Sequence, residues 1–145
     1  MGNSAYYYPS PKQIGRSIKY DRSQGTFFNR KTKRPLNLIY HRNEQVLSTK
    51  NGLIPAGDLA YALVHGEWPT GQINYGNGDV FDLRWANLTL DAPRHKGVYW
   101  YKRSRRWQGM FQHNRTYHHV GYFDDQEAAA EAVAEAKEAL ASSGG

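Results

Sequence analysis

The chain has 145 residues, of which 39% are hydrophobic, 22% are charged and none is cysteine. This length fits one compact domain or two small ones, and the lack of cysteine excludes a disulfide framework, a cysteine-ligated zinc finger and a thiol nucleophile. No apolar run approaches the roughly 20 residues of a membrane helix, and the first residues do not read as a signal peptide. We therefore expect a soluble intracellular protein without a membrane partner.

The amino-terminal third is expected to hold short strands. Residues 1–17 combine aromatic and turn-forming residues without a period, so they are expected to be loose. Downstream, β-branched and aromatic residues alternate with turn signals. The candidate strands are residues 18–20, 26–28 and 36–40.

The first helix is expected over residues 57–66. Asp58 can cap its start, and Gly66 and then Pro69 stop it. A segment rich in glycine and asparagine follows and must turn sharply. Residues 82–88 can then form a second short helix.

The clearest module lies near the carboxyl terminus. Asp124 and Glu127 have the spacing of a capping box, which predicts a helix with an apolar stripe made mostly of alanine. Residues 142–145 are expected to be a tail. Before the helix, alternating apolar and polar positions predict three antiparallel strands over residues 97–101, 106–112 and 117–122.

The alternation assigns the two faces of this predicted sheet. An alanine-rich helix can approach a sheet closely when large partners fill the gap. We expect it to cover the face formed by Val98, Trp100, Trp107, Gly109, Phe111, His118 and Val120. The other face is expected to remain exposed, with Tyr99, Tyr101, Arg106, Gln108, Met110, Gln112, Tyr117 and His119.

Charge is unevenly distributed along the chain, whose net charge is +6. Residues 1–50 hold ten Lys/Arg and two Asp/Glu, and residues 94–115 hold seven Lys/Arg and no acid. The segments 51–93 and 116–145 are net acidic. Because both basic segments also carry aromatic residues, they fit phosphate neutralisation combined with contacts to bases or sugars. This pattern favours nucleic acid as the partner.

Two stretches resemble known families. Residues 97–123, followed by Glu127-Ala128-Ala129, resemble the ethylene-response-factor type of DNA-binding domain, which lays a three-stranded sheet in the major groove and backs it with one helix. Residues 66–88 resemble the core of phage HNH homing endonucleases, through Gly66-Glu67-Trp68-Pro69, Asn77-Gly78-Asp79, Asp82, Arg84 and Asn87-Leu88. The amino-terminal opening of that family is similar to Lys19-Tyr20-Asp21 with Thr26-Phe27.

The resemblance implies an α+β chain. Its expected parts are a loose segment 1–17, a degenerate HNH (ββα-like) region 18–93, and a DNA-binding domain 94–141 in which a three-stranded antiparallel sheet packs on one helix. It also implies a phage protein in the cytoplasm of a bacterial host cell.

The HNH active-site positions depart from the family pattern. The family uses an Asp to hold a divalent metal, a His as general base, an Asn that orients this His and a final Asn on the metal. These positions are Asn74, Tyr75, Leu83 and Asn87 here. A neutral amide binds a hard cation more weakly than a carboxylate does, and a phenol with an ordinary pKa of about 10 is a poor base at neutral pH. No residue is therefore assigned as catalytic, and Asn87 alone stays a metal candidate.

The DNA-binding resemblance supplies the expected contact residues. Arginine and lysine side chains can bind phosphates or guanine edges, and Gln108 and Gln112 can read adenine. Outward positions that are often arginine in the family are Tyr99 and Tyr101 here, which suggests stacking. The full set is Lys96, Tyr99, Tyr101, Arg103, Arg105, Arg106, Gln108, Gln112, Arg115, Tyr117 and His119.

Three functions follow as hypotheses. The first is a protein that binds double-stranded DNA, derived from an HNH endonuclease without its nuclease activity and without a cofactor. The second is an inhibitor that binds a host protein or ribonucleoprotein complex, such as a nucleic-acid-guided defence effector. The third is an active HNH nickase with an atypical site, which alone would need magnesium.

Overall fold

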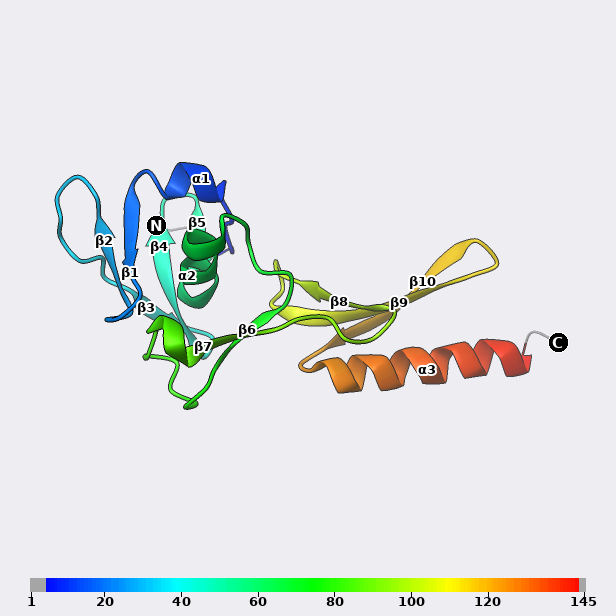
Figure 1. Ribbon diagram of the computed structural model, residues 1–145. Helices are drawn as coiled ribbons and strands as arrows, with labels where there is room; N and C mark the ends of the chain where they lie inside the picture. Colours follow the sequence, from blue (N-terminus) through cyan, green and yellow to red (C-terminus); the bar gives the residue numbers. More distant parts are fainter. Residues whose placement is uncertain (1–4, 144–145) are drawn as a thin grey trace. The chain divides into compact units, whose positions relative to one another are not determined.

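A computed structural model describes residues 5–143 (Figure 1). The fold is mixed α+β, as expected, and the described residues form ten strands in four small sheets and a carboxyl-terminal helix. The chain divides into two compact units. Unit 1 runs to Pro69 and resumes over Ile73–Asp91, and unit 2 comprises Thr70–Gln72 and the chain from Ala92 onward.

Unit 1 is built from three of the four sheets and short helices. Strands β1 (Ile18–Asp21) and β2 (Thr26–Asn29) pair antiparallel. Strands β3 (Ile39–His41), β4 (Glu44–Thr49) and β5 (Gly52–Pro55) form an antiparallel meander that leads directly into α2 (Ala56–His65). Strands β6 (Gln72–Tyr75) and β7 (Leu88–Asp91) pair, with a single 3-10 turn η1 (Trp85–Asn87) between them. The expected helix over 82–88 is thus reduced to this one turn.

The core of unit 1 draws on elements far apart in sequence. Phe27, Ile54, Leu59 and Leu83 are almost fully buried in one cluster with Ile18. Burying side chains of this size contributes about 1.5–3 kcal/mol each. Strands β4 and β5 complete this packing although the sequence analysis did not predict them, because the polar residues of β4 hide its alternation.

The amino-terminal segment is not loose within the described residues. Helix α1 (Pro11–Ile14) follows Ser10, whose hydroxyl accepts a hydrogen bond from the Gln13 backbone. The indole of Trp68 donates to the Pro9 carbonyl at 2.7 Å. Tyrosine rings can bury against a core even where the sequence shows no regular spacing of apolar residues, as Tyr7 does here, and this packing orders the segment. Residues 1–4 of the expected loose stretch lie outside the described residues.

Asp58 is not the helix cap that its position suggests. Helix α2 begins one residue earlier than expected, after Pro55, and no side chain caps it. Asp58 lies inside the first turn, is 1% exposed, and accepts a hydrogen bond from the Tyr8 hydroxyl. A carboxylate inside the first turn still complements the positive helix end, so the residue supports the helix start in another way.

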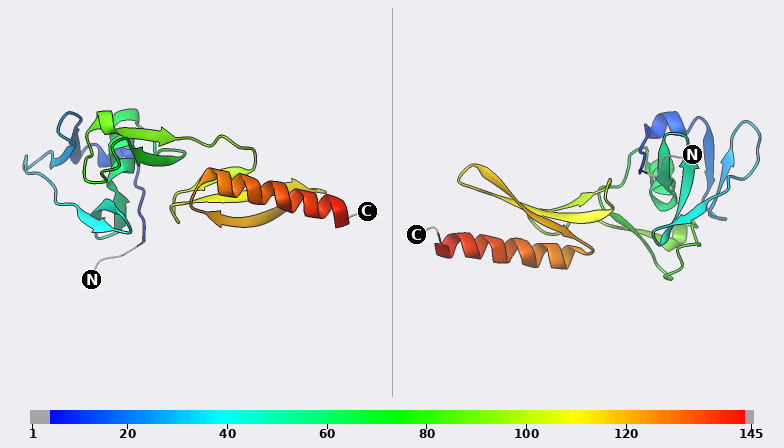
Figure 2. Two further views of the ribbon diagram at one scale, coloured as in Figure 1. Left: turned by 90° about the horizontal axis from the view of Figure 1, so that it is seen from below. Right: turned by 180° about the vertical axis from the view of Figure 1, so that it is seen from behind.

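Unit 2 has the predicted architecture. Strands β8 (Val98–Tyr101), β9 (Arg106–His113) and β10 (Thr116–Phe123) form an antiparallel sheet in the order β10-β9-β8, followed by α3 (Gln126–Ser143). Figure 2 shows α3 lying along one face of this sheet. The helix extends to Ser143, so residues 142 and 143 of the expected tail are helical, and residues 144–145 lie outside the described part.

The helix approaches the sheet closely at Gly109. A Cβ atom there would lie 3.0 Å from Cγ2 of Val133, and Ala129 is fully buried beside it. Trp107 is fully buried and packs against Trp100 with ring centroids 5.1 Å apart. Small residues on the helix therefore leave room for the large rings of the sheet, as the sequence predicted.

The helix start differs in detail from the capping-box expectation. The carboxylate of Asp125, not Asp124, accepts a hydrogen bond from the Ala128 backbone. Glu127 pairs with Arg94 instead. Gln126 is fully buried: its side chain accepts from the Arg94 backbone and donates to the Ala92 carbonyl. These bonds fix the segment that enters the sheet to the first turn of α3.

A β-bulge in β10 changes the predicted alternation. The register pairs His119 with Met110 but Gly121 with Gly109, so Val120 has no partner in the ladder. After the bulge, the alternation of side chains between the two faces of the sheet is shifted by one residue. Val120 was predicted to share the helix-covered face, but Phe123 takes the place opposite Trp107, and Tyr122 lies opposite Gln108.

No described helix is long and apolar enough to cross a membrane.

Candidate nucleic-acid interface

The uncovered side of the unit 2 sheet carries the candidate interface. We call it the open face. Cross-strand pairs place its side chains in rows, since directly opposed residues share a face: Tyr99 lies opposite Gln108, Tyr101 opposite Arg106, and Gln112 opposite Tyr117. The open face comprises Tyr99, Tyr101, Arg106, Gln108, Met110, Gln112, Tyr117, His119 and Tyr122.

The aromatic rings of the open face are available to a partner. Tyr117 is 69% exposed and Tyr99 52% exposed. Rings of this size normally bury much of their area in a folded protein. Their exposure on one side of a sheet, away from the helix, marks a surface suited to stacking or to contacts with sugars.

Tyr122 joins the open face although the sequence analysis did not include it. Its ring centroid lies 5.7 Å from that of Tyr101 and 4.8 Å from that of His119. The bulge before Gly121 turns its side chain to this side. The sequence signal that could have found it is Gly121 itself, since a glycine inside a strand often marks a bulge; its φ is +154°.

Basic side chains surround the rings unevenly. Arg103 is exposed in the turn after β8, and Lys96 is exposed just before β8. The guanidinium of Arg106 lies 3.2 Å from the Asp124 carboxylate, and an exposed pair of this kind is weak enough to exchange for phosphate. Arg105 is placed differently: its guanidinium lies 5.5 Å from the ring of Trp100, which pairs with buried Trp107. The structure therefore does not bring Arg105 to the open face.

The tip of the β9–β10 hairpin presents Arg115. His113 and Thr116 close the hairpin, and the two residues between them both have positive φ, +52° for Asn114 and +64° for Arg115. This is the backbone pattern of a type I′ turn, which favours Asn followed by Gly. Arginine at the second position is strained, and the turn places this exposed cation at the end of the hairpin.

A groove of about 330 Å³ lies where β9 extends past the start of β8. Gly97, which lines it, allows the backbone before β8 to approach β9 closely: its φ is +83°, and a Cβ there would lie 2.5 Å from the Met110 carbonyl oxygen. Lys96, Tyr99 and Tyr117 are among the residues that line the groove. Lys137 of α3 lines it as well, and two cations and two rings around one concave site suit a phosphate with its attached sugar.

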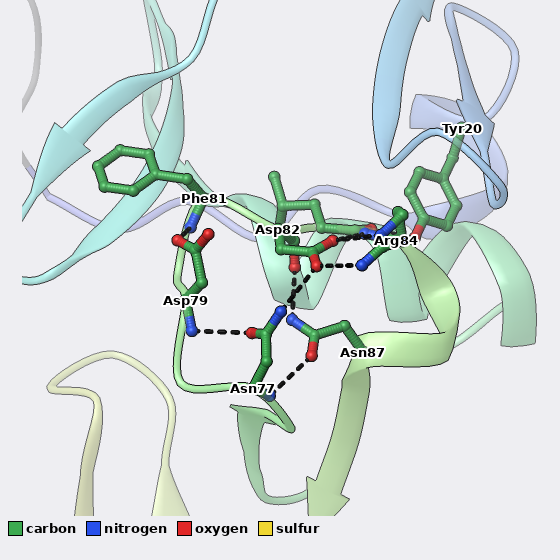
Figure 3. Close-up of polar contacts among 8 residues, drawn as sticks. Tyr20, Asn77, Asp79, Phe81, Asp82, Arg84 and Asn87 are labelled. Carbon is green, nitrogen blue, oxygen red and sulfur yellow. Dashed lines mark hydrogen bonds and ion pairs between the residues drawn. The ribbon is translucent and has the colours of Figure 1, made fainter.

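The region that resembles an HNH active site is an amide-rich loop (Figure 3). The Asn87 side chain accepts a 2.9 Å hydrogen bond from the Asn77 backbone and donates one of 2.9 Å to the Asp82 carbonyl. The Asn77 amide donates to the Asp82 carboxylate at 2.9 Å. Arg84 donates to both oxygens of the same carboxylate, at 2.8 and 2.6 Å. The polar atoms of the loop are thus engaged with one another.

The four positions that the resemblance compares with an HNH active site have different environments. Leu83 is 2% exposed and belongs to the core of unit 1, whereas Asn74 is exposed on β6. Tyr75 is half-buried against the same core. Asn87 is 9% exposed, and both polar atoms of its side chain are occupied by loop bonds. These bonds orient the Asn87 side chain, whose oxygen keeps a second lone pair.

Electrostatics stabilise the loop rather than prepare a proton acceptor. The Arg84 guanidinium holds the pKa of the Asp82 carboxyl well below its usual range. Burial raises the pKa of Tyr20 to about 12, and its hydroxyl donates to the Leu83 carbonyl. Among the described residues, no three His, Asp or Glu side chains gather as metal ligands.

The two histidines of unit 1, His41 and His65, lie in aromatic surroundings. The ring of His65 packs against Tyr61 at 4.4 Å and Trp85 at 5.6 Å between centroids. Nε2 of His41 is buried without a hydrogen-bond partner in the described structure. Glu44 lies opposite His41 in the register of β3 and β4.

Searches with protein-family models, against curated proteins and against solved structures found no match to the chain.

Proposed function

We propose that this chain is a nucleic-acid-binding protein that applies the open face of unit 2 to double-stranded DNA. The observation that carries the proposal is the set of exposed rings on the side of the sheet that α3 leaves uncovered, with Arg106 among them and exposed Lys96, Arg103 and Arg115 in the flanking turns. Cations supply most of the affinity through phosphates, and flat rings add contacts to sugars and bases.

The resemblance of residues 66–88 to phage HNH endonucleases supports an origin in that family, and we propose that the nuclease activity is absent. Leu83 is part of the core, and Asn87 joins the two ends of its loop. Phosphodiester hydrolysis by an HNH-type site needs a metal and a base; Leu83 offers neither, and the neutral amide of Asn87 is not a base.

The proposal is tested by fluorescence anisotropy with a labelled 20-base-pair duplex. If about four phosphates are neutralised, log affinity should fall with log salt at a slope of roughly −3.6. The double variant Tyr99→Ser/Tyr117→Ser should bind at least tenfold more weakly, since stacking on one ring is worth about 1–3 kcal/mol. Tyr40→Ser is the matched control because Tyr40 is 57% exposed in unit 1.

Two outcomes would contradict the proposal. One is an affinity that does not depend on salt. The other is a pull-down from bacterial lysate in which a protein partner is retained after nuclease treatment while duplex DNA does not bind; this result would favour an inhibitor of a host complex. Magnesium- or manganese-dependent nicking of plasmid DNA would contradict the loss of catalysis.

A further inference from the structure

Unit 1 contains a basic groove that is separate from the open face. Helix α1, strand β1 and the carboxyl-terminal half of α2 line it, and these elements all belong to unit 1 (Figure 1). Its volume is about 670 Å³, roughly twice that of the groove beside β9. Among residues 5–143, five cations and no acid line it: Lys12, Arg16, Lys19, Arg22 and Arg30.

These cations are available for an external anion. Lys12, Arg16, Lys19 and Arg22 are exposed, and none of them forms an ion pair within the described part of the chain. Arg30 is held in place by a 2.7 Å hydrogen bond from its Nε to the Gly15 carbonyl. Like charges repel when they gather without a counter-charge, so an arrangement of this kind fits a polyanionic partner.

The acidic groups nearby do not cancel this charge. The carboxylate of Asp21, on the same strand as Lys19, accepts hydrogen bonds from Ser23 and Gln24 in the turn. The negative end of α2, at Gly66, contributes only about half an elementary charge. Five full positive charges exceed both contributions.

The walls of the groove favour the sugar-phosphate backbone over the bases. Ile18 and Ala62 are buried and give it an apolar floor. The one aromatic residue that lines it, Tyr20, is half-buried and its hydroxyl is bonded to the Leu83 carbonyl, so this ring is not free to stack on a base. We propose that this groove is a second nucleic-acid site, which binds the phosphodiester backbone without reading sequence.

The experiment uses the full chain and two variants with the same change in charge. The groove variant is Arg16→Gln/Lys19→Gln/Arg22→Gln. The control is Arg34→Gln/Lys31→Gln/Arg42→Gln, whose positions are exposed in unit 1 but do not line the groove. Binding is measured by anisotropy with duplex and single-stranded 20-mers between 50 and 200 mM salt.

We expect the groove variant to bind about tenfold or more weakly and its salt slope on duplex DNA to decrease by about 2.7. The control should change affinity less than threefold. Arg16→Lys/Lys19→Arg/Arg22→Lys keeps the charge and should keep the affinity. Comparing duplex with single strand identifies which form of the backbone the groove prefers.

Three results would overturn the inference: equal losses in the groove variant and the control, a loss in the charge-preserving variant, or competition by polyglutamate as effective as that by nucleic acid of equal charge. The last would identify an acidic peptide as the occupant. The inference fails separately from the open-face proposal. If Tyr99→Ser/Tyr117→Ser weakens binding and the groove variant does not, the groove is not a nucleic-acid site. If the groove variant weakens binding and Tyr99→Ser/Tyr117→Ser does not, the open face is not a nucleic-acid site.

Discussion

The side-chain oxygen of Asn87 accepts a 2.9 Å hydrogen bond from the backbone nitrogen of Asn77, ten residues earlier in the chain. The same side chain donates to the carbonyl of Asp82. One buried amide thus holds together the loop that connects β6 to β7, at the position where a nuclease of the resembling family has a metal ligand.

Replacing this amide should affect stability and not DNA binding. Asn87→Ala leaves the Asn77 nitrogen and the Asp82 carbonyl without their partner, which costs about 1–3 kcal/mol. Urea unfolding should show this loss, while duplex affinity below the transition stays within twofold of the original protein. Unchanged stability combined with the loss of a magnesium-dependent activity would instead indicate a catalytic Asn87.

The carboxylate of Asp82 should make stability depend on acid pH. Its pKa is lowered in the folded protein from the ordinary value of 3.8, chiefly by hydrogen bonds from Arg84. A group of this kind contributes stability that is present above its unfolded pKa and is lost as the pH falls toward the folded value. Asp82→Asn should therefore melt at a lower temperature than the original protein at pH 6. The difference between the two melting temperatures should narrow between pH 4 and pH 2. A constant gap would contradict this linkage.

The contact between α3 and the sheet should be sensitive to side-chain volume. Gly109→Val inserts atoms where a Cβ alone already lies 3.0 Å from Val133, and overpacking of this kind costs about 1–3 kcal/mol. Chemical denaturation of Gly109→Val, Val133→Ala and the double variant forms a cycle. We expect the double variant to lose less free energy of unfolding than the two single variants lose together, because alanine at position 133 makes room for valine at position 109. Additive effects would mean that the two sites do not touch.

The strained turn at the tip of β9–β10 should separate stability from binding. Arg115 has a φ of +64°, and glycine relieves a left-handed backbone by about 1 kcal/mol. Arg115→Gly should therefore raise the melting temperature, yet weaken duplex binding and reduce the salt slope by about 0.9. Arg115→Asn, which also tolerates this conformation, serves as a second neutral variant. Unchanged affinity in both would remove the hairpin tip from the interface.

The bulge in β10 predicts which side chain reaches DNA. Tyr122→Ser should weaken duplex binding about fivefold or more, since the register places Tyr122 opposite Gln108 on the open face. Val120→Ser should change affinity little, because Val120 has no partner in the ladder. Anisotropy titrations of the two variants decide between the bulged register and an uninterrupted alternation, which would place both side chains on the helix-covered face and leave both affinities close to that of the original protein.

The sequence by itself determined most of unit 2 and little of unit 1. Strands β8 to β10 alternate over adjacent segments and join through short turns, so their local pattern also reports which face is buried. The exposure of Tyr99 and Tyr117 and the burial of Trp107 follow from that pattern. Strand β4 was missed because it mixes polar residues into both faces, and its role depends on packing with β5.

Tertiary structure decided the features that no local pattern carries. The bulge transfers Tyr122 to the open face, and the ring of Trp100 keeps Arg105 off it. Five cations spread over residues 12 to 30 line one groove because α1, β1 and α2 pack together. Periodicity reports how neighbouring side chains point along one element, whereas the meeting of residues from different elements depends on the path of the whole chain.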